Sequence, residues 1–278
     1  MTLRRLDELR AHRRDDALRR GINPRDVDLL LSDLLDRSLA YLYAHGELEV
    51  DSAQLDARLA RRYAGEPLQY IRGHAEFYSR DFLVDARALI PRPETELLVE
   101  TAIERAPAHG RVIDIGTGTG CIAISIERER SDLQVLSVDR SLDALALAAA
   151  NKARLESNVT LAASDVLASV RGTFDIIVSN PPYVPLGEYR QLAVEVRIHE
   201  PRMALTPGPA GTEIIERILD EAHARLEPRG CLILEVGYGQ EEAIRTLAAA
   251  KRYVVEEFLP DLAGIPRVVV LSAHAEPR

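Results

Sequence analysis

The sequence of 278 residues has no tryptophan, only two methionines and only two cysteines, Cys121 and Cys231. Two cysteines are too few for a disulfide framework or for a four-cysteine zinc site. The longest apolar run, residues 144–150, is far shorter than the roughly 20 residues of a membrane helix. The first 20 residues are rich in charge and lack the apolar core of a secretory signal. We therefore expect a reduced, cytoplasmic protein with no membrane partner.

Positive charge is also scarce, since 35 basic residues face 44 acidic ones and leave a net charge of −9. Acids and arginines balance in residues 1–73, so the negative excess lies in the rest of the chain. Proteins that grip phosphate backbones usually carry a basic face, because counterion release supplies much of their affinity. The composition therefore argues against direct binding of nucleic acid. Apolar residues at 46% are ordinary for a globular chain of about two domains.

The N-terminal quarter has the pattern of a small helical domain, which we place at residues 1–72. Asn23-Pro24 is typical of a helix start, and apolar residues then recur with helical period until about Gly46. Asp51 is a candidate cap for a further helix, and no strand-like alternation is present. Residues 73–92 predict a connecting β-hairpin.

From residue 93 to residue 278 the pattern alternates between strands and helices. Strands are expected at 112–115, 133–138, 159–162, 174–179, 231–236, 254–258 and 268–271, with helices at 121–129 and 141–154. Such alternation indicates an α/β fold with a mostly parallel, seven-stranded sheet that is covered on both faces. Residues 187–209 form the one long irregular segment, and long loops in compact domains often have a function.

A glycine-rich segment, Asp114-Ile-Gly116-Thr-Gly118-Thr-Gly120, follows the first strand of this domain. Glycines here allow a tight turn and let a ligand approach the N–H groups of the following helix. The spacing lacks the G-x-G-x-x-G of dinucleotide-binding proteins, and Asp114 would repel a pyrophosphate. An acid beside the loop suits a ligand that carries an ammonium group. The alternative is a cluster of turn glycines without a ligand.

Two further acids follow the next strands. Asp139 lies 21 residues after Gly118, at the end of the second strand, where a carboxylate can bind both hydroxyls of a ribose. A nucleoside without phosphates fits both this position and the acidic glycine loop. Asp165 follows the third strand and is a candidate neighbour for an adenine ring, although aspartate also caps helices often.

The tetrapeptide Asn180-Pro181-Pro182-Tyr183 follows the fourth strand. Consecutive prolines stop a strand and stiffen the loop. The Asn180 side-chain oxygen and the Pro181 carbonyl can then act as fixed acceptors for an –NH2 group, with the ring of Tyr183 beside them. An amide or exocyclic amine nitrogen is a weak nucleophile, and holding its N–H groups favours attack on an electrophile. The alternative is a proline turn with a packed tyrosine.

These motifs resemble the class I S-adenosylmethionine-dependent methyltransferases that act on planar amino groups. More narrowly, the chain is similar to the bacterial release factor glutamine methyltransferases, the PrmC or HemK family. Further segments that carry this resemblance are Gly65–Gly73, Glu76–Tyr78, Leu89–Glu96 and Val196–Pro201. The resemblance implies a class I methyltransferase domain with a small N-terminal helical domain.

The resemblance implies S-adenosylmethionine as the methyl donor, S-adenosylhomocysteine as the product, and no metal. The glycine loop would wrap the methionine part, through Gly116, Thr117, Gly118, Thr119 and Gly120. Asp139 would hold the ribose, Asp165 and Val166 would flank the adenine, and Asn180 would also border the cofactor.

The resemblance also implies a protein substrate, a class I peptide chain release factor. Asn180 and the Pro181 carbonyl would grip the side-chain amide of the glutamine in its Gly-Gly-Gln loop, with Pro182 and Tyr183 beside that amide. Asn180, Pro181 and Tyr183 are thus the implied catalytic residues. The helical domain would recognise the body of the factor, and Arg92 and Glu94 would line the cleft.

Other assignments stay open. An N6-adenine or N4-cytosine nucleic acid methyltransferase would present an exocyclic amine to the same motif, but it would need a positive surface. A glutamine methyltransferase of ribosomal protein L3 shares the glycine and Asn-Pro-Pro-Tyr motifs, and a nucleoside-binding regulator is a non-enzymatic alternative.

Metal and thiol chemistry are not expected. His74, His199 and His223 lack the spacing of metal ligands. Cys121 begins a predicted helix, which can lower a thiol pKa, but buried packing is the more frequent role of such a residue.

Overall fold

The structure, a computed structural model, describes residues 3–273 and divides into two compact units. The first unit contains the chain up to Gly73 together with Val194–His199. The second contains His74–Ala193 and the chain from Glu200 onward. The helical segment Val194–His199 (α10) was expected in the irregular segment of the second unit, and it packs in the first.

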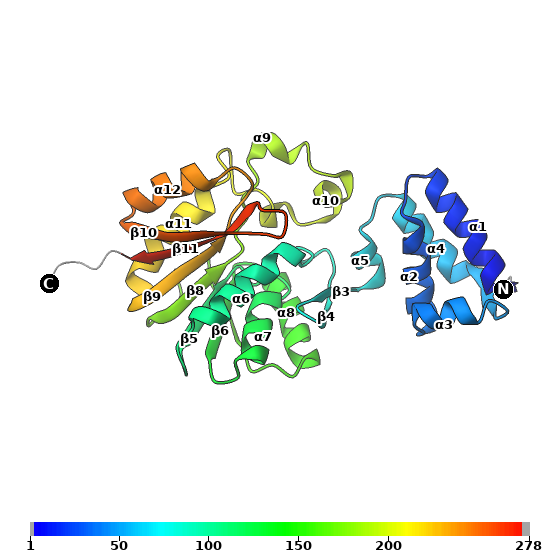
Figure 1. The fold of residues 1–278 in the computed structure, drawn as a ribbon, viewed down its shortest axis with the longest axis horizontal. Coiled ribbons are helices and arrows are strands. Elements are labelled where there is room, and N and C mark those ends of the chain that lie inside the picture. The colour runs from blue at the N-terminus through cyan, green and yellow to red at the C-terminus, as the bar shows by residue number, and fades with distance from the viewer. Residues whose placement is uncertain (1–2, 274–278) are drawn as a thin grey trace. The chain divides into compact units, whose positions relative to one another are not determined.

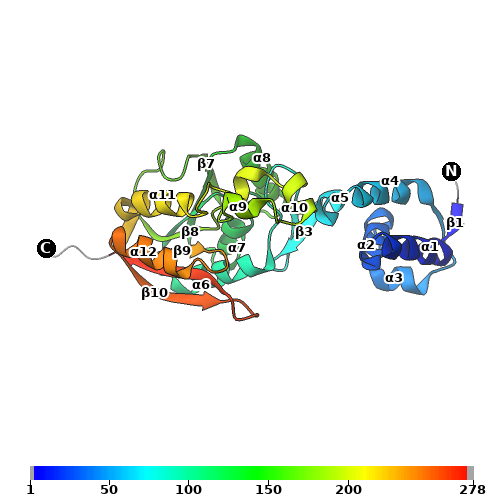
Figure 2. The ribbon, with the colours of Figure 1, turned by 90° about the horizontal axis from the view of Figure 1, so that it is seen from above.

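The first unit is built around helix α2, which contacts the other helices that precede Gly73 (Figure 2). Besides α10, its helices are α1 (Leu6–Arg19), α2 (Pro24–Leu35), α3 (Leu39–Ala44), α4 (Ser52–Tyr63) and α5 (Leu68–Arg72). The predicted caps are confirmed, since the side chain of Asn23 accepts a hydrogen bond from the N–H of Arg25 and that of Asp51 from Ala53. Leucines dominate the core of this unit.

Two expectations for this unit were wrong. The helix predicted to run to Gly46 ends at Leu35, because Asp36 adopts a left-handed conformation with φ 50°, and Ser38 then caps α3. The unit also contains a short antiparallel pair of strands, β1 (Leu3–Arg5) and β2 (Glu49–Asp51), although no strand was expected. Their pairing joins distant segments, which a local pattern does not reveal.

The second unit contains a seven-stranded sheet with the order β10-β11-β9-β8-β5-β6-β7 (Figure 1). The strands are β5 (Arg111–Ile115), β6 (Gln134–Asp139), β7 (Thr160–Ala163), β8 (Phe174–Ser179), β9 (Leu226–Glu235), β10 (Tyr253–Pro260) and β11 (Pro266–Ala273). The five strands β5 to β9 pair in parallel, and β10 and β11 add antiparallel pairs at one side. The mostly parallel sheet expected from the sequence is confirmed.

Helices cover both faces of this sheet because successive buried residues of each strand point to opposite faces. Val112 and Ile176 belong to one apolar cluster, with residues of α6 (Glu96–Arg105) and α7 (Cys121–Glu129). Ile113 and Ile177 belong to the other, with residues of α11 (Glu213–Ala222) and α12 (Glu241–Ala250). Helix α8 (Leu142–Arg154) contacts β6 and β7. The sheet is thereby buried between two helical layers.

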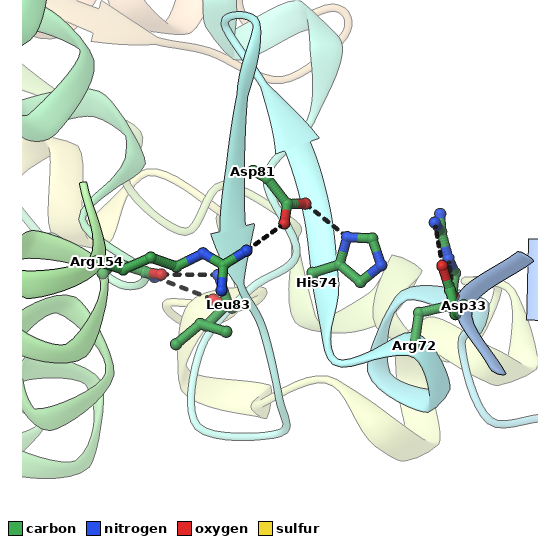
Figure 3. Close-up of polar contacts among 7 residues, drawn as sticks. Asp33, Arg72, His74, Asp81, Leu83 and Arg154 are labelled. Atoms are coloured by element: carbon green, nitrogen blue, oxygen red, sulfur yellow. Dashed lines mark hydrogen bonds and ion pairs between the residues drawn. The ribbon is translucent and has the colours of Figure 1, made fainter. Parts of the chain in front are cut away.

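The predicted hairpin forms from β3 (His74–Phe77) and β4 (Arg80–Leu83). Figure 3 shows Asp81 between His74 and Arg154 of α8, with which its two carboxylate oxygens interact. The side chain of Asn151 in α8 accepts from the N–H of Leu83 at 2.7 Å and donates to its carbonyl at 3.0 Å. The hairpin is thus held on the helix that follows β6. It ends at Leu83, whereas the sequence predicted a hairpin over residues 73–92.

The segment expected to be irregular contains three short helices. These are α9 (Leu186–Tyr189), α10 (Val194–His199) and the 3-10 turn η2 (Arg202–Ala204). In α10 the carboxylate of Glu195 accepts a hydrogen bond from Arg62 of α4, which also donates to Asp26.

Among residues 3–273, no helix is both long enough and apolar enough to cross a membrane.

Candidate active site

A pocket of about 230 Å³ opens at the carboxyl ends of the parallel strands, and all of its lining residues belong to the second unit. In open parallel sheets ligands bind in the crevice at this end of the strands. Its walls come from the loops after β5, β6, β7 and β8 and from two further segments, 87–92 and 201–207. The pocket therefore gathers the loops in which the sequence placed its candidate residues.

The glycine loop forms one wall of the pocket. Gly116, Gly118 and Gly120 have φ of 80°, 54° and 84°, a left-handed conformation that glycine adopts without strain. The N–H groups of Gly116 and Thr117 donate to the carbonyl of Val138 on the neighbouring strand, at 2.8 and 3.0 Å. A Cβ at Gly116 would meet no atom within 4 Å, so the backbone there is open to a ligand. Gly120 is not among the lining residues.

Gly120 instead serves packing, and its replacement gives a stability prediction. A Cβ there would lie 2.9 Å from Cδ1 of Ile124 and 3.3 Å from Cβ of Ala148, in a left-handed conformation. We expect Gly120→Ala to lower the free energy of unfolding by about 1–3 kcal/mol, from strain and overpacking together. Gly239→Ala, with φ of 75° and no atom within 4 Å, is the matched control for strain alone. Urea unfolding that shows equal losses for both variants would contradict the packing argument.

Asp139 is fixed by the loops on both sides of it. One carboxylate oxygen accepts from the N–H of Gly118 at 3.0 Å, and the other accepts from the N–H of Ser141 at 2.8 Å. Its side chain lines the pocket, and each oxygen keeps a second lone pair for a ligand. The aspartate thus couples the glycine loop to the start of α8.

Asp165 and Val166 lie together at the pocket wall after β7. The carboxylate of Asp165 pairs with Arg217 of α11 at 3.0 Å, and about half of its side chain is exposed. Val166 is buried and has φ of 52°, which a β-branched residue rarely adopts. Strained backbone of this kind gathers at ligand sites.

Asp114 is fully buried in β5, directly before the lining residues of the glycine loop, and is not itself a lining residue. Its Oδ2 accepts from the hydroxyl of Ser137 at 2.8 Å, whereas Oδ1 has no hydrogen-bond partner. Burial raises the pKa of the Asp114 carboxyl to about 7, more than the hydrogen bonds from Ser137 and Thr117 lower it. An unsatisfied acceptor of this kind suits a cationic ligand group nearby.

The raised pKa of Asp114 predicts how stability depends on pH. Between the ordinary carboxyl pKa of about 4 and the folded pKa of about 7, the folded chain holds a proton that the unfolded chain releases. Stability from this group is therefore full below about pH 4 and is lost as the pH rises to about 7. We expect Asp114→Asn to lose this dependence, so that the variant gains stability relative to the wild type as the pH rises from about 4 to about 7. Parallel pH profiles in urea unfolding of the two ligand-free proteins would contradict the assignment.

Asn180 lies at the end of β8, where the hydroxyl of the preceding Ser179 donates to the carbonyl of Ile115 at 2.7 Å. The Nδ2 of Asn180 donates to Oγ1 of Thr95 at 3.1 Å. Its Oδ1 is the amide atom left to accept from a ligand. Asn180, Pro181 and Pro182 all line the pocket.

Tyr183 is not among the lining residues. Its hydroxyl donates to Oε1 of Glu235 at 3.3 Å, and its carbonyl accepts from Gln240. Burial raises the pKa of the Tyr183 hydroxyl, so it stays neutral at physiological pH. The structure therefore places the Tyr183 side chain beside β9, outside the set of residues that line the pocket.

Three residues at the site were given no role from the sequence, although Thr95, which lines the pocket, and Glu200 lie in segments that carry the family resemblance. Thr95 and Glu235 are buried and hydrogen-bonded to each other, and Glu200 is buried against Ile90 and Arg92, whose N–H groups both donate to it. For Glu235 the available signal was its place inside the apolar segment 231–236, where a charge is costly to bury. Arg92 lines the pocket as expected, whereas Glu94 is exposed and does not.

The structure gives no support to metal or thiol chemistry at the residues that it describes. Among residues 3–273, no group of three or more histidine, cysteine or acidic residues could hold a metal ion. Cys121 is buried beside the pocket, and burial raises the pKa of its thiol to about 12. A thiol of such high pKa is a poor nucleophile.

The sheet order, the glycine loop and the pocket at the carboxyl ends of the strands define a class I methyltransferase. A methyltransferase from Pyrococcus furiosus has a similar fold, with a TM-score of 0.55 and 20% identity, over 78% of this chain and 98% of that one. The family model for the methyltransferase small domain matches residues 93–211, and that for the PrmC N-terminal domain matches residues 16–73.

Closer relatives are release factor glutamine methyltransferases. The one from Koribacter versatilis is 43% identical over 88% of this chain and 89% of its own length. The one from Salmonella typhimurium is 39% identical over 92% of this chain and 95% of its own length. The chain belongs to the release factor glutamine methyltransferase family.

Proposed function

We propose that this enzyme transfers a methyl group from S-adenosylmethionine to the side-chain amide nitrogen, N5, of the glutamine in the Gly-Gly-Gln motif of class I peptide chain release factors. The observation that carries the proposal is the amide of Asn180. Because its Nδ2 donates to Thr95, its Oδ1 is free to accept at the pocket wall, next to Pro181. Two acceptors side by side suit a primary amide, which has two N–H donors.

The residues of the pocket fit S-adenosylmethionine. The orphaned, buried Oδ1 of Asp114 beneath the glycine loop suits the positive charge of the methionine part. Gly116 to Gly120 would surround that part, with Gly120 supporting the loop from behind. Asp139 would bind the ribose with its spare lone pairs, and Asp165 and Val166 would flank the adenine.

When bound, S-adenosylmethionine supplies an electrophilic methyl carbon on a sulfur that is already a good leaving group. The chain has to orient a weakly nucleophilic amide nitrogen toward that carbon. Asn180 and the Pro181 carbonyl would hold its two N–H groups, with Pro182 at the wall and Tyr183 supporting the loop. Such positioning accounts for a large part of catalysis when the reacting groups are themselves weak. The new bond would join the amide nitrogen to the methyl carbon as the carbon–sulfur bond breaks, leaving neutral S-adenosylhomocysteine. We assign no general base, because the nitrogen would lose its extra proton to water after it has become cationic.

We further propose that residues 1–72 recognise the body of the release factor, that residues 73–92 connect the two parts, and that residues 93–278 carry out the transfer. The match of residues 16–73 to a domain specific to this family supports the first assignment. The net charge of −9 is in keeping with a protein substrate rather than a nucleic acid.

The test is the intact mass of a purified class I release factor after incubation with the enzyme and S-adenosylmethionine. We expect one added methyl group on the wild-type factor and none on a variant whose loop glutamine is alanine. Duplex DNA and ribosomal protein L3 are incubated in parallel. Methylation of either one, with none on the release factor, would overturn the proposal and move the substrate to that alternative.

A further inference from the structure

A buried chain of hydrogen bonds links the site to β9. Asn180 Nδ2 donates to Thr95 Oγ1 at 3.1 Å, and the Thr95 hydroxyl donates to Glu235 Oε2 at 2.6 Å. Thr95 is 2% exposed and Glu235 is 1% exposed, so water does not compete for these bonds. The chain brings together three segments that lie far apart in the sequence: the turn Pro93–Thr95, the end of β8 and the end of β9.

This chain of bonds has a direction. A threonine hydroxyl has a single proton, and a carboxylate only accepts. Burial raises the pKa of the Glu235 carboxyl to about 7, so above this pH it is the ionised carboxylate that takes the proton of Thr95. With that carboxylate as its acceptor, Thr95 can only accept from Asn180. The amide of Asn180 must therefore turn its –NH2 toward Thr95 and its oxygen away from it. Without the carboxylate, Thr95 could donate to the amide oxygen, and the –NH2 group would then face the substrate.

That second orientation would be unproductive, because a donor cannot receive the N–H groups of a substrate amide. The other end of the motif depends on the same carboxylate, since the Tyr183 hydroxyl donates to Glu235 Oε1 at 3.3 Å. We propose that Thr95 and Glu235 are positioning residues that hold the Asn180 amide in its accepting orientation. The inference rests on the proposed function and assigns a role to residues outside the Asn-Pro-Pro-Tyr motif.

Variants of nearly equal shape separate this role from packing. Thr95→Val removes the hydroxyl, and Glu235→Leu removes the acceptor. We expect each to lower kcat for release factor methylation at least tenfold, with the Kd for S-adenosylmethionine within about threefold of the wild type. Thr95→Ser keeps the hydroxyl, and we expect it to stay within about threefold of the wild-type kcat.

Thr101→Val is a matched control, because Thr101 is equally buried and its hydroxyl donates to the carbonyl of Leu97 within α6. We expect it to keep the wild-type kcat. A double variant then tests whether Thr95 acts through Asn180. Thr95→Val should cause no further loss of kcat in an Asn180→Ala background, because the amide to be oriented is absent.

The outcomes separate the two proposals. A wild-type enzyme that adds no methyl group to the release factor would overturn the proposed function and this inference together. A wild-type enzyme that is active, with Thr95→Val equally active, would overturn the inference alone. Equal further loss in the Asn180→Ala background, or a loss that Thr95→Ser does not rescue, would also overturn it, because either result indicates a structural role.

Discussion

Replacing Asn180 with alanine is expected to lower kcat about 100-fold or more, while the Kd for S-adenosylmethionine changes little. The side chain supplies one of the two acceptors at the pocket wall, and its oxygen has no other assigned partner. Removal of a preorganised hydrogen-bonding group from a transition state typically costs a factor of this size. The loss should appear in kcat more than in KM, because the bond is most needed when the amide nitrogen approaches the methyl carbon.

The measurement combines single-turnover methylation of a release factor with calorimetric titration of S-adenosylmethionine. Asn158→Ala is the matched control, because that side chain bonds to Glu127 on another part of the unit. If the Kd for S-adenosylmethionine rose as strongly as kcat fell, the main role of Asn180 would be to bind the cofactor. Its assignment to the substrate amide would then be wrong.

Replacing Asp139 with alanine is expected to weaken binding of S-adenosylmethionine by about 2–4 kcal/mol, or roughly 30-fold to 1000-fold in Kd. Two effects act in the same direction. The ribose would lose a charged acceptor for its two hydroxyls. The glycine loop would also lose the bond from the Gly118 N–H, and the start of α8 the bond from the Ser141 N–H.

Calorimetric titration of the variant against the wild type measures this change. Asp143→Ala, an exposed acid in the first turn of α8, is the control for a loss of negative charge nearby. Asp139→Asn keeps one acceptor oxygen, and we expect it to bind with an intermediate Kd. A Kd for Asp139→Ala within about threefold of the wild type would remove the ribose from the assignment of this residue.

The sequence predicts the features of this fold that depend on neighbours along the chain. Runs of apolar residues locate the seven strands, although β9 begins at Leu226 and not at the predicted residue 231, and the caps at Asn23 and Asp51 form as expected. The end of α2 was missed because Asp36 interrupts the helix by its left-handed conformation alone, while the apolar period continues past it.

The candidate site divides in the same way. Loops that follow parallel strands meet at one edge of the sheet, so Asp139, Asp165 and Asn180 could be brought together from their positions alone. Thr95 and Glu235 could not be brought together in this way, because 140 residues separate them. Only the hydrogen bond between them in the folded chain indicates a shared role. The sequence also places Tyr183 at the substrate, whereas its hydroxyl faces Glu235.

Because α10 belongs to the first unit, fragments and chimeras of this enzyme cannot be designed from the N-terminal segment alone. Glu195 in α10 bonds to Arg62, 133 residues earlier, so no single cut in the chain separates the two units. A fragment that begins at residue 74 would keep α10 without the partners that hold it. A chimera that borrows the N-terminal unit of a relative should therefore exchange residues 194–199 as well. The N-terminal segment and α10 fold as one unit, although they are separate in the sequence.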